Sequence, residues 1–431
     1  MEASRILMNY RQLVAYFVRY GLILWLIPIQ LGVSLIVALQ RGAPWRGDII
    51  WTLDWLGVAL TLIAPLVAGI AAVDAARLLG NVSYLEGNRI SRTPHIALVS
   101  AYGLAVTALQ VFTLLVAVLV SHPSSLPVNA LLVALNQSLV LIVMVSLGSL
   151  AGRLGGSVFG GILAVLAGAV VMFTFGYSDT YLSPFDYGGA TVPRVGYIYN
   201  TTTLLAQTAM LALLTVALSM TRLTKRGPRR ALRLADAGGI AGILVAVMVI
   251  VLVAPAERLS PSDERPTTCG AAATIPTCFY PEHRRVASAY TEQFWVLATA
   301  AMDKGYPAFL PTQVVEASQT YHPRAQDPSV GEFIVSPEGL AGETPTLWEI
   351  ALGVLEPGHC AQLQTDIPPS QRYADDLYSL IGTWLHLVDP SEAEMAGLVG
   401  IKSLSPEEVA DLVEAFRTCN YPYFTVESAG Q

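Results

Sequence analysis

Histidines, acids and thiols beyond residue 280 are the first candidates for chemistry. Zinc is held by sets of such side chains, and two of its ligands often lie one helical turn apart, as in H-E-x-x-H. The chain has no H-E-x-x-H sequence, and no two of its later histidines have this helical spacing. We therefore predict no metal site from these candidates, which are His283, His322, His359, His386, Glu282 and Cys360.

A second candidate is a serine nucleophile in the glycine-rich stretch 155–160, GGSVFG. The stretch resembles the G-x-S-x-G turn of serine hydrolases, but Phe159 occupies the position of the last glycine. Neither His95 nor His122 falls in the middle of a predicted span, where a general base would be required. No glycine is followed by lysine anywhere in the chain, so it has no P-loop for nucleotide either. We expect no catalytic residue and no cofactor.

The composition places the chain in a membrane. Of its 431 residues, 53% are hydrophobic and 13% are charged, whereas soluble domains carry about 25% charged residues. Its charges are unevenly distributed, because 24 of the 32 acidic residues but only 9 of the 25 basic residues follow residue 254. A basic membrane part and an acidic tail argue against nucleic acid as a partner and for a solvated external module.

The orientation of the chain follows from the stretch 222–254. Six basic residues are clustered at its start, and an apolar run long enough to cross a bilayer follows at 237–254. Short loops rich in lysine and arginine stay in the cytoplasm, so the run carries the rest of the chain out. All four cysteines lie beyond it, as expected for an oxidising compartment. The basic residues are Arg222, Lys225, Arg226, Arg229, Arg230 and Arg233.

Seven spans account for the hydrophobic pattern, with a cytoplasmic N-terminus and an extracytoplasmic C-terminus. The predicted inner segments hold 13 basic residues and the outer loops hold three, which supports this topology. Residues 1–19 are expected to form an amphipathic helix on the inner leaflet, although a plain cytoplasmic lead-in also fits. The spans are expected at about 20–39, 50–73, 96–120, 129–151, 157–176, 201–221 and 237–254.

A few residues stand out inside the predicted transmembrane domain, residues 20–254. Asp54 either lines a path for a solute or, as is more common near an interface, is hydrated. Asn136 and Gln137 are expected to bond across helices. Glycines four residues apart at 148–160 predict close helix packing, interrupted by a tight turn at 155–156. The tyrosine-rich segment 177–200 is predicted to be either an aromatic belt or a re-entrant segment.

The tail is predicted to be a tether at 255–274 and a folded domain at 275–431. Helical repeats, the motif Ser405-Pro406 with Glu408 three residues after the cap, and a similar start at Asp389 predict a mainly α-helical domain. GEFIVS is the one predicted strand.

The four cysteines allow three disulfide connectivities. The short segment between Cys269 and Cys278 favours a bond between these two, which leaves Cys360 with Cys419. A bond from Cys278 to Cys419 remains an open alternative. The predicted fold class is therefore an all-α polytopic membrane protein with seven transmembrane helices and a disulfide-bonded extracytoplasmic domain.

The lead-in helix, six spans with a long inner loop between the second and third, and the missing ATPase together resemble the permease subunits of type-two ABC exporters. In that family the lead-in lies flat on the membrane and the loop after the second span docks on the ATPase. The resemblance implies these roles for residues 5–19 and 77–92. The corresponding coupling residues are Arg77, Tyr84, Glu86, Arg89 and Arg92. Residues 269–283, CGAAATIPTCFYPEH, also resemble the start of an extracytoplasmic domain of some actinobacterial permease-like proteins.

The favoured hypothesis is a non-enzymatic permease subunit in the cell membrane, paired with a second permease chain as a homo- or heterodimer. A cytosolic ABC ATPase would supply energy, and the external domain would gate or capture the solute. The alternative is a membrane-anchored receptor or assembly protein that transports nothing. A third class, an external hydrolase, requires a nucleophile or metal cluster that the sequence lacks.

Overall fold

The structure is a computed structural model that divides into two compact units. Unit 1 comprises Met1–Gln40, Ile49–Thr191 and Tyr197–Ser260, and unit 2 comprises Arg41–Asp48, Val192–Gly196 and Pro261–Gln431. The residues described are 2–85, 93–175, 187–189, 192–220, 223–226, 229–232, 234–253, 257–262, 265–272, 274–317, 327, 329–356, 360, 371–398 and 403–421.

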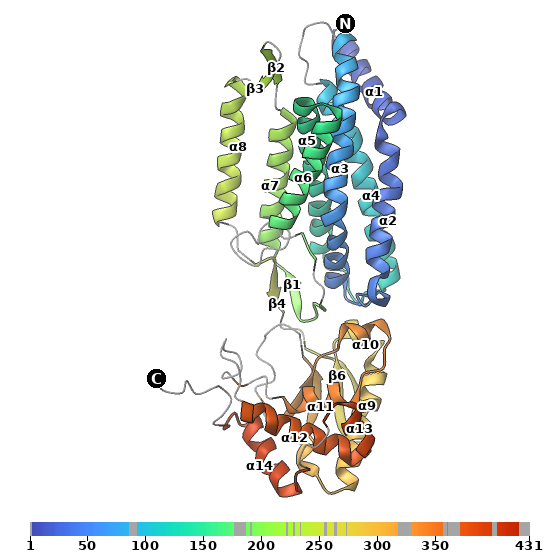
Figure 1. Ribbon diagram of the computed structural model, residues 1–431, viewed down its shortest axis with the longest axis vertical. Coiled ribbons are helices and arrows are strands. Elements are labelled where there is room, and N and C mark those ends of the chain that lie inside the picture. Colours follow the sequence, from blue (N-terminus) through green and yellow to red (C-terminus); the bar gives the residue numbers. More distant parts are fainter. Residues whose placement is uncertain are drawn as a thin grey trace. The chain divides into compact units, whose positions relative to one another are not determined.

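Unit 1 is a bundle of long apolar helices (Figure 1). Six of the described helices are long and apolar enough to cross a membrane, at Leu22–Gly42, Ile49–Leu78, His95–Ser121, Asn129–Gly155, Ser157–Thr174 and Thr201–Ser219. These candidate spans coincide with the first six predicted spans. The helices are α1 (Glu2–Tyr20), η1 (Leu22–Trp25), α2 (Leu26–Leu39), α3 (Ile49–Leu85), α4 (Thr93–Ser121), α5 (Asn129–Gly155), α6 (Ser157–Phe175), α7 (Thr201–Met220) and α8 (Leu234–Val253), and the short η2 (Gln40–Gly42) follows α2.

Helix α3 forms the centre of this bundle and packs closely on α5 and α6. The predicted glycine face makes this possible. A Cβ atom at Gly148 would lie 2.0 Å from the carbonyl oxygen of Ala68, and one at Gly152 would lie 1.9 Å from that of Ala72. Since real Cβ atoms do not come so near, only glycine allows the two backbones to touch.

The chain reverses between α5 and α6 at a single residue, Gly156, whose φ of 79° is in the left-handed region. Glycine adopts this conformation without the strain that a side chain would cause. Gly160, on the first turn of α6, then faces the backbone of Ala151 at 2.8 Å from an ideal Cβ. The predicted tight turn is confirmed, and α5 and α6 form a helical hairpin around it.

Helices α7 and α8 form an antiparallel pair that is tied at both ends (Figure 1). Between them, β2 (Leu223–Arg226) and β3 (Arg229–Leu232) pair antiparallel, so the cationic segment is a hairpin rather than an irregular loop. At the other end, β1 (Tyr197–Tyr199), which precedes α7, pairs with β4 (Leu259–Pro261), which follows α8. Both helices have 20 residues, so α8 runs the full length of α7.

Unit 2 contains a four-stranded mixed sheet in the order β5-β6-β7-β8, in which β5 and β6 are antiparallel and the other pairs are parallel. The strands are β5 (Thr268–Ala272), β6 (Ile275–Phe279), β7 (Gln313–Glu316) and β8 (Val330–Phe333). The helices are η4 (Pro281–His283), α9 (Ala287–Asp303), η5 (Pro307–Phe309), α10 (Pro337–Ala341), α11 (Leu347–Leu355), α12 (Gln371–Val388), α13 (Pro390–Met395) and α14 (Pro406–Arg417).

The predicted starts of two helices in unit 2 are confirmed. Ser405 and Glu408 form a reciprocal capping box at α14, and Asp389 caps α13 by accepting from the amide of Ser391. The prediction of a single strand was wrong, because only β8 falls in GEFIVS. Strand β5, for example, is built from TCGAA, whose small side chains carry no alternating apolar signal.

Both disulfides have the pairing that the cysteine spacing favours. Cys269 and Cys278 face each other across β5 and β6, and this bond is called the hairpin disulfide. Cys360 and Cys419 close a separation of 59 residues, and this bond is called the long-loop disulfide. Because β4 and β5 both lie within 255–274, the expected tether already contains strands of the fold.

Two further segments belong to unit 2 although they come from the N-terminal half of the chain. Residues 41–48, called the α2–α3 segment, bury Trp45 and Asp48 to 2% exposure each. The amide of Arg194, in the segment 192–196, donates to Oδ2 of Asp48 over 2.9 Å. The sequence predicts plain outer loops here, so this incorporation into a folded unit is a finding of the structure.

Candidate functional site

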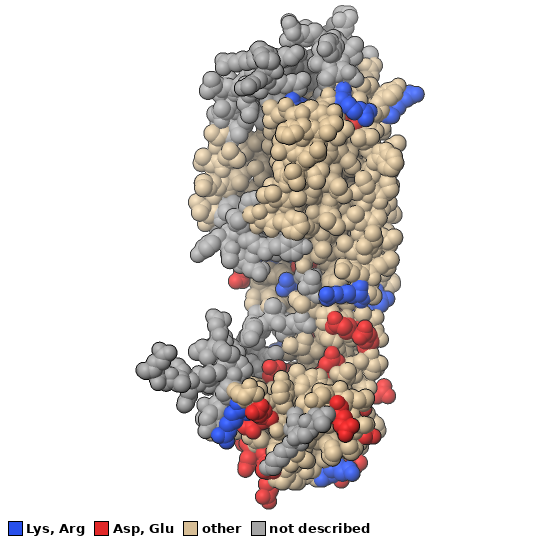
Figure 2. Space-filling model, in the orientation of Figure 1, with Lys and Arg blue, Asp and Glu red and all other residues tan. Residues whose placement is uncertain are grey.

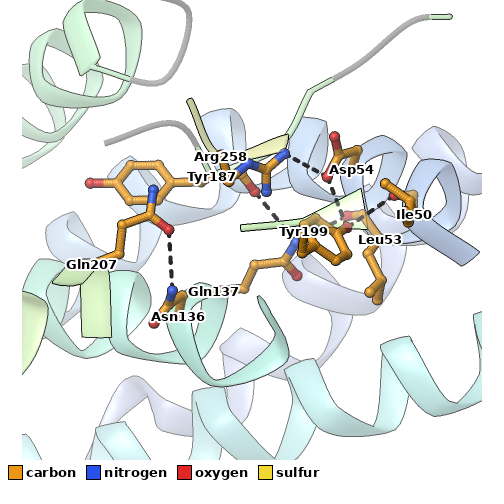
Figure 3. Close-up of polar contacts among 9 residues, drawn as sticks. All are labelled: Ile50, Leu53, Asp54, Asn136, Gln137, Tyr187, Tyr199, Gln207 and Arg258. Carbon is orange, nitrogen blue, oxygen red and sulfur yellow. Dashed lines mark hydrogen bonds and ion pairs between the residues drawn. The ribbon is translucent and has the colours of Figure 1, made fainter. Parts of the chain in front are cut away.

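The most polar buried region of unit 1 is organised around an ion pair between Asp54 and Arg258 (Figure 3). Asp54 lies near the start of α3, and Arg258 lies between α8 and β4. A guanidinium nitrogen, Nη2, donates to Oδ1 of Asp54 over 2.6 Å, and the two side chains are only 1% and 4% exposed. Two buried charges at this distance hold α3 to the segment that follows α8.

The aromatic ring of Tyr199 completes the surroundings of this ion pair. Its hydroxyl lies 3.2 Å from Oδ1 of Asp54 and 3.2 Å from the carbonyl oxygen of Ile50 (Figure 3). The guanidinium carbon of Arg258 lies 5.6 Å from the centre of the ring, within the range of a cation–π contact. Tyr199 is in β1, so the ion pair is also held by the strand that precedes α7.

The short segment 187–189 lies directly on this part of α3. The amide of Gly189 donates to the carbonyl oxygen of Asp54 over 2.7 Å. Gly188 has a φ of 109°, and a Cβ there would lie 3.0 Å from the backbone of Asp54. A Cβ at Gly57 would lie 2.7 Å from the carbonyl oxygen of Tyr187. Glycine on both sides therefore allows the segment to lie directly against the backbone of α3 at Asp54.

A chain of side-chain amides continues from the ion pair through the bundle. Gln137 on α5 donates to the carbonyl oxygen of Leu53, next to Asp54, over 3.0 Å. Gln110 on α4 donates to Gln137 over 2.9 Å, and Gln30 on α2 donates to Gln110 over 3.2 Å. Four helices thus share one hydrogen-bonded line.

A second branch of amides joins α5 to α7. Asn136 donates to Oε1 of Gln207 over 3.2 Å (Figure 3). It also donates to the carbonyl oxygen of Leu204 over 3.1 Å. The hydroxyl of Thr208 donates to Oδ1 of Asn136 over 2.6 Å. The prediction that Asn136 and Gln137 bond across helices is confirmed. Amides do not titrate, so both branches hold helices together rather than move protons.

The expectation that Asp54 is hydrated was wrong, because its side chain is 1% exposed and paired with Arg258. This partner lies 204 residues later in the sequence. Arg258 follows the last apolar run, and nothing in its local sequence points to α3. Burying an unpaired carboxylate costs far more free energy than burying a paired one. Once Asp54 is buried, it therefore requires a cation beside it. Tyr187 and Tyr199 are buried at 7% and 3% exposure, so these two tyrosines are not in a belt at an interface.

A second buried carboxylate, Asp74, lies farther along α3. Its Oδ2 atom accepts from the amide of Leu22 over 2.5 Å and from the hydroxyl of Tyr102. Leu22 begins η1, directly after α1, and Tyr102 is on α4. Asp74 therefore fixes the junction of α1 and η1 to α3 and α4, and Arg77 adds a 3.5 Å contact to the carbonyl oxygen of Tyr20.

The predicted coupling residues lie in and just after the end of α3. Arg77 and Tyr84 are part of this helix, which continues to Leu85. Glu86, Arg89 and Arg92 lie outside the described residues. The structure therefore describes only the first part of the predicted coupling segment, up to Leu85.

The histidine candidates do not come together among the described residues. His283 is fully buried in unit 2, where its Nδ1 atom lies 2.5 Å from Oε1 of Glu316, and His386 is on α12. His322 and His359 lie outside the described residues, and Cys360 is in the long-loop disulfide. No group of three or more possible metal ligands occurs in the part of the chain that the structure describes.

Comparison with known proteins found no similar protein. No protein-family model, no curated protein and no solved structure matches the chain. Any function must therefore be argued from the helices, the buried charges and the composition of the chain itself.

Proposed function

We propose that the chain is the membrane subunit of an ATP-driven exporter, an ABC permease that is energised by a separate cytosolic ATPase. The observation that carries the proposal is the way α1 and α3 are joined. A 19-residue helix precedes the first span, and the carboxylate of Asp74 on α3 binds the junction between them. Helix α3 then continues past its apolar part, which ends at Leu78, into the segment proposed to contact the ATPase.

In this proposal, a push on the segment 77–92 moves α3 and the α1 junction together. Tyr102 extends the connection to α4, because its hydroxyl bonds to the same carboxylate. Helix α3 also packs along α5 and α6, so its displacement would reach most of the bundle. Two permease chains and two ATPases would form the working exporter.

The proposal includes seven spans, with unit 2 outside the cytoplasm. Helix α8 supports the seventh span, because it is as long as α7, runs antiparallel to it, and exposes apolar side chains such as Val245, Met248 and Leu252. Exposed apolar faces of this length are suited to lipid. The cationic hairpin between α7 and α8 would then be cytoplasmic. The acidic surface of unit 2 (Figure 2) and its disulfides agree with an external, oxidising location.

The buried ion pair acts in this proposal as the outer closure of the solute path. It joins α3 to Tyr199 in β1 and to Arg258, the residue directly before β4, and β1 and β4 are the two strands that pair at this end of α7 and α8. Separating α3 from α7 and α8 requires Asp54 and Arg258 to part. A solute or water that pairs with the two charges would lower the cost of this step.

Purification in mild detergent tests the proposal. We expect an ABC ATPase to copurify and to be lost from the variant Arg89→Glu/Arg92→Glu. The matched control is Arg265→Glu/Arg372→Glu, which reverses two exposed arginines of unit 2 and should retain the ATPase. A chain that purifies without any ATPase, with nucleotide absent or present, would refute the exporter and favour an anchored receptor or assembly protein.

A further inference from the structure

Two arginines of unit 2 converge on the α2–α3 segment, residues 41–48. Nε of Arg46 donates to the carbonyl oxygen of Ala43 over 3.2 Å, within the segment itself. Nη2 of Arg285, which lies just after η4, donates to the carbonyl oxygen of Pro44 over 2.9 Å. Ala43 and Pro44 are consecutive residues, whose Cα atoms are about 3.8 Å apart. The two guanidinium groups therefore meet at one short stretch of backbone.

Neither arginine forms an ion pair in the part of the chain that the structure describes. The ion pairs found there join other residues. Asp48, the acid closest to Arg46 in the sequence, is buried and accepts from the amide of Arg194. A guanidinium has five N–H donors, and the contacts to Ala43 and Pro44 engage one donor on each side chain. Most donors of both groups are therefore left for another acceptor.

The two positive charges are accessible and repel each other. Arg285 is exposed and Arg46 is half-buried. Partial burial and the charge of Arg46 lower the pKa of Arg285 to about 10, so Arg285 is still a cation at neutral pH. An anion bound to both groups removes the repulsion. Arginine is suited to phosphate in particular, because its planar fork of donors matches the phosphate oxygens.

The course of the chain keeps this arginine pair close to a bilayer. The candidate spans Leu22–Gly42 and Ile49–Leu78 are separated by residues 43–48 alone. Arg46 precedes the second span by three residues, which at full extension is about 10 Å. The headgroup layer, which contains the lipid phosphates, extends roughly 5–7 Å beyond the hydrocarbon core on each side. Arg46 is therefore within reach of lipid phosphates, and Arg285 is bound to the same segment.

We propose that Arg46 and Arg285 bind the phosphodiester of a lipid headgroup, whose acyl chains remain in the bilayer. The two guanidinium groups donate to the phosphate oxygens, which takes up donors that the described part of the chain leaves without an acceptor. One lipid then joins the α2–α3 segment to the segment after η4. This inference requires only that α2 and α3 cross a bilayer, and it does not depend on the proposed transport function.

Photocrosslinking of the full-length protein in neutral detergent tests the inference. The probe is a phosphatidylglycerol with a diazirine on its headgroup, added below saturation, and the labelled peptides are identified after digestion. We expect labelling of the peptides that contain 41–48 and 284–286, and this labelling should fall as salt screens the charges. Unlabelled phosphatidylglycerol should compete. Diacylglycerol with the same acyl chains should not compete, and inorganic phosphate should compete only at far higher concentration.

The variant Arg46→Gln/Arg285→Gln should reduce labelling of these two peptides by about tenfold or more, since the loss of one charge-assisted hydrogen bond costs about that factor. Arg46→Lys/Arg285→Lys keeps the charges without the planar forks, so its labelling should lie in between. The matched control is Arg265→Gln/Lys304→Gln, which removes two charges from exposed positions of unit 2 and should be labelled like the unmodified protein.

The competition experiments use the unmodified protein, so the inference stays testable if a variant does not fold. It is overturned if neither peptide is labelled, or if diacylglycerol competes as well as phosphatidylglycerol. Competition by inorganic phosphate at the same concentration as the lipid would also overturn it, because the site would then take a free phosphate. So would equal losses of labelling in the glutamine variant of the arginine pair and in the control, because net charge alone would then explain binding.

Discussion

The substitution Asp54→Asn is the sharpest test of the buried cluster in unit 1. It keeps the size of the side chain and removes the charge, so Arg258 is left as a cation at 4% exposure without its carboxylate. At 2.6 Å and an effective dielectric constant of about 20, the direct attraction amounts to about 6 kcal/mol before desolvation. Breaking one side of such a buried pair typically destabilises a protein by about 3–5 kcal/mol.

The double variant Asp54→Asn/Arg258→Gln removes both charges. It distinguishes the effect of an unpaired buried charge from the effect of altered packing. Neutral replacement of a whole buried pair costs little, so the double variant should be more stable than Asp54→Asn alone. The free energy of unfolding can be measured by denaturant titration in mixed micelles, followed by tryptophan fluorescence. Trp51 and Trp55, on the same turns of α3, report directly on this region.

A matched control is Asp303→Asn, which neutralises an exposed acid at the end of α9 and should change stability by less than about 0.5 kcal/mol. The reasoning is refuted if Asp54→Asn is no more damaging than this control. It is refuted as well if the losses of stability in Asp54→Asn and in Arg258→Gln add up to the loss in the double variant. Such additivity would mean that the two charges do not interact.

Three further predictions concern packing, crosslinking and capping. Gly152→Val should prevent folding or cost more than about 3 kcal/mol by thermal unfolding, because its Cβ would overlap the carbonyl of Ala72, whereas Gly32→Ala, with open space at its Cβ, should be nearly neutral. Replacing the long-loop disulfide by two serines should lower the free energy of unfolding by about 4 kcal/mol, and replacing the hairpin disulfide should lower it by about 3 kcal/mol. The reason is that a bond across 59 residues restricts the unfolded chain more than a bond across 9 residues. The reverse order in calorimetry would contradict this reasoning. Ser405→Ala should destabilise unit 2 by about 1 kcal/mol in a chemical denaturation, and Ser405→Asp, which keeps a capping oxygen, should restore most of it.

The membrane helices were predictable from the sequence because the forces that define them are local. A run of about 20 apolar residues satisfies its own backbone hydrogen bonds within one helix, so its position is visible without knowledge of its neighbours. Close packing of α5 on another helix was likewise visible in the spacing of Gly148 and Gly152, but the identity of that helix, α3, was not. The caps of α13 and α14 depend on residues two or three positions apart, and they were also predicted correctly.

Apart from the local hairpin of β5 and β6, the features that sequence reasoning missed depend on partners far apart in the chain. The ion pair of Asp54 joins residues 204 positions apart, and the segment 41–48 packs on residues near 282. Strand β7 pairs in parallel with β6 and β8, so its hydrogen bonds come from segments that follow or precede it by many residues. None of these partners alters the local hydrophobic pattern.

The orientation of the polypeptide is the claim on which the exporter proposal depends. A variant in which Cys360 and Cys419 are replaced by serine keeps only the hairpin disulfide, whose Cys269 is exposed. Intact cells expressing it can be treated with a membrane-impermeant reductant and then with a membrane-impermeant maleimide. Labelling of Cys269 in intact cells, only after reduction, is the result that the account predicts. Labelling that appears only after lysis, or without prior reduction, would contradict it.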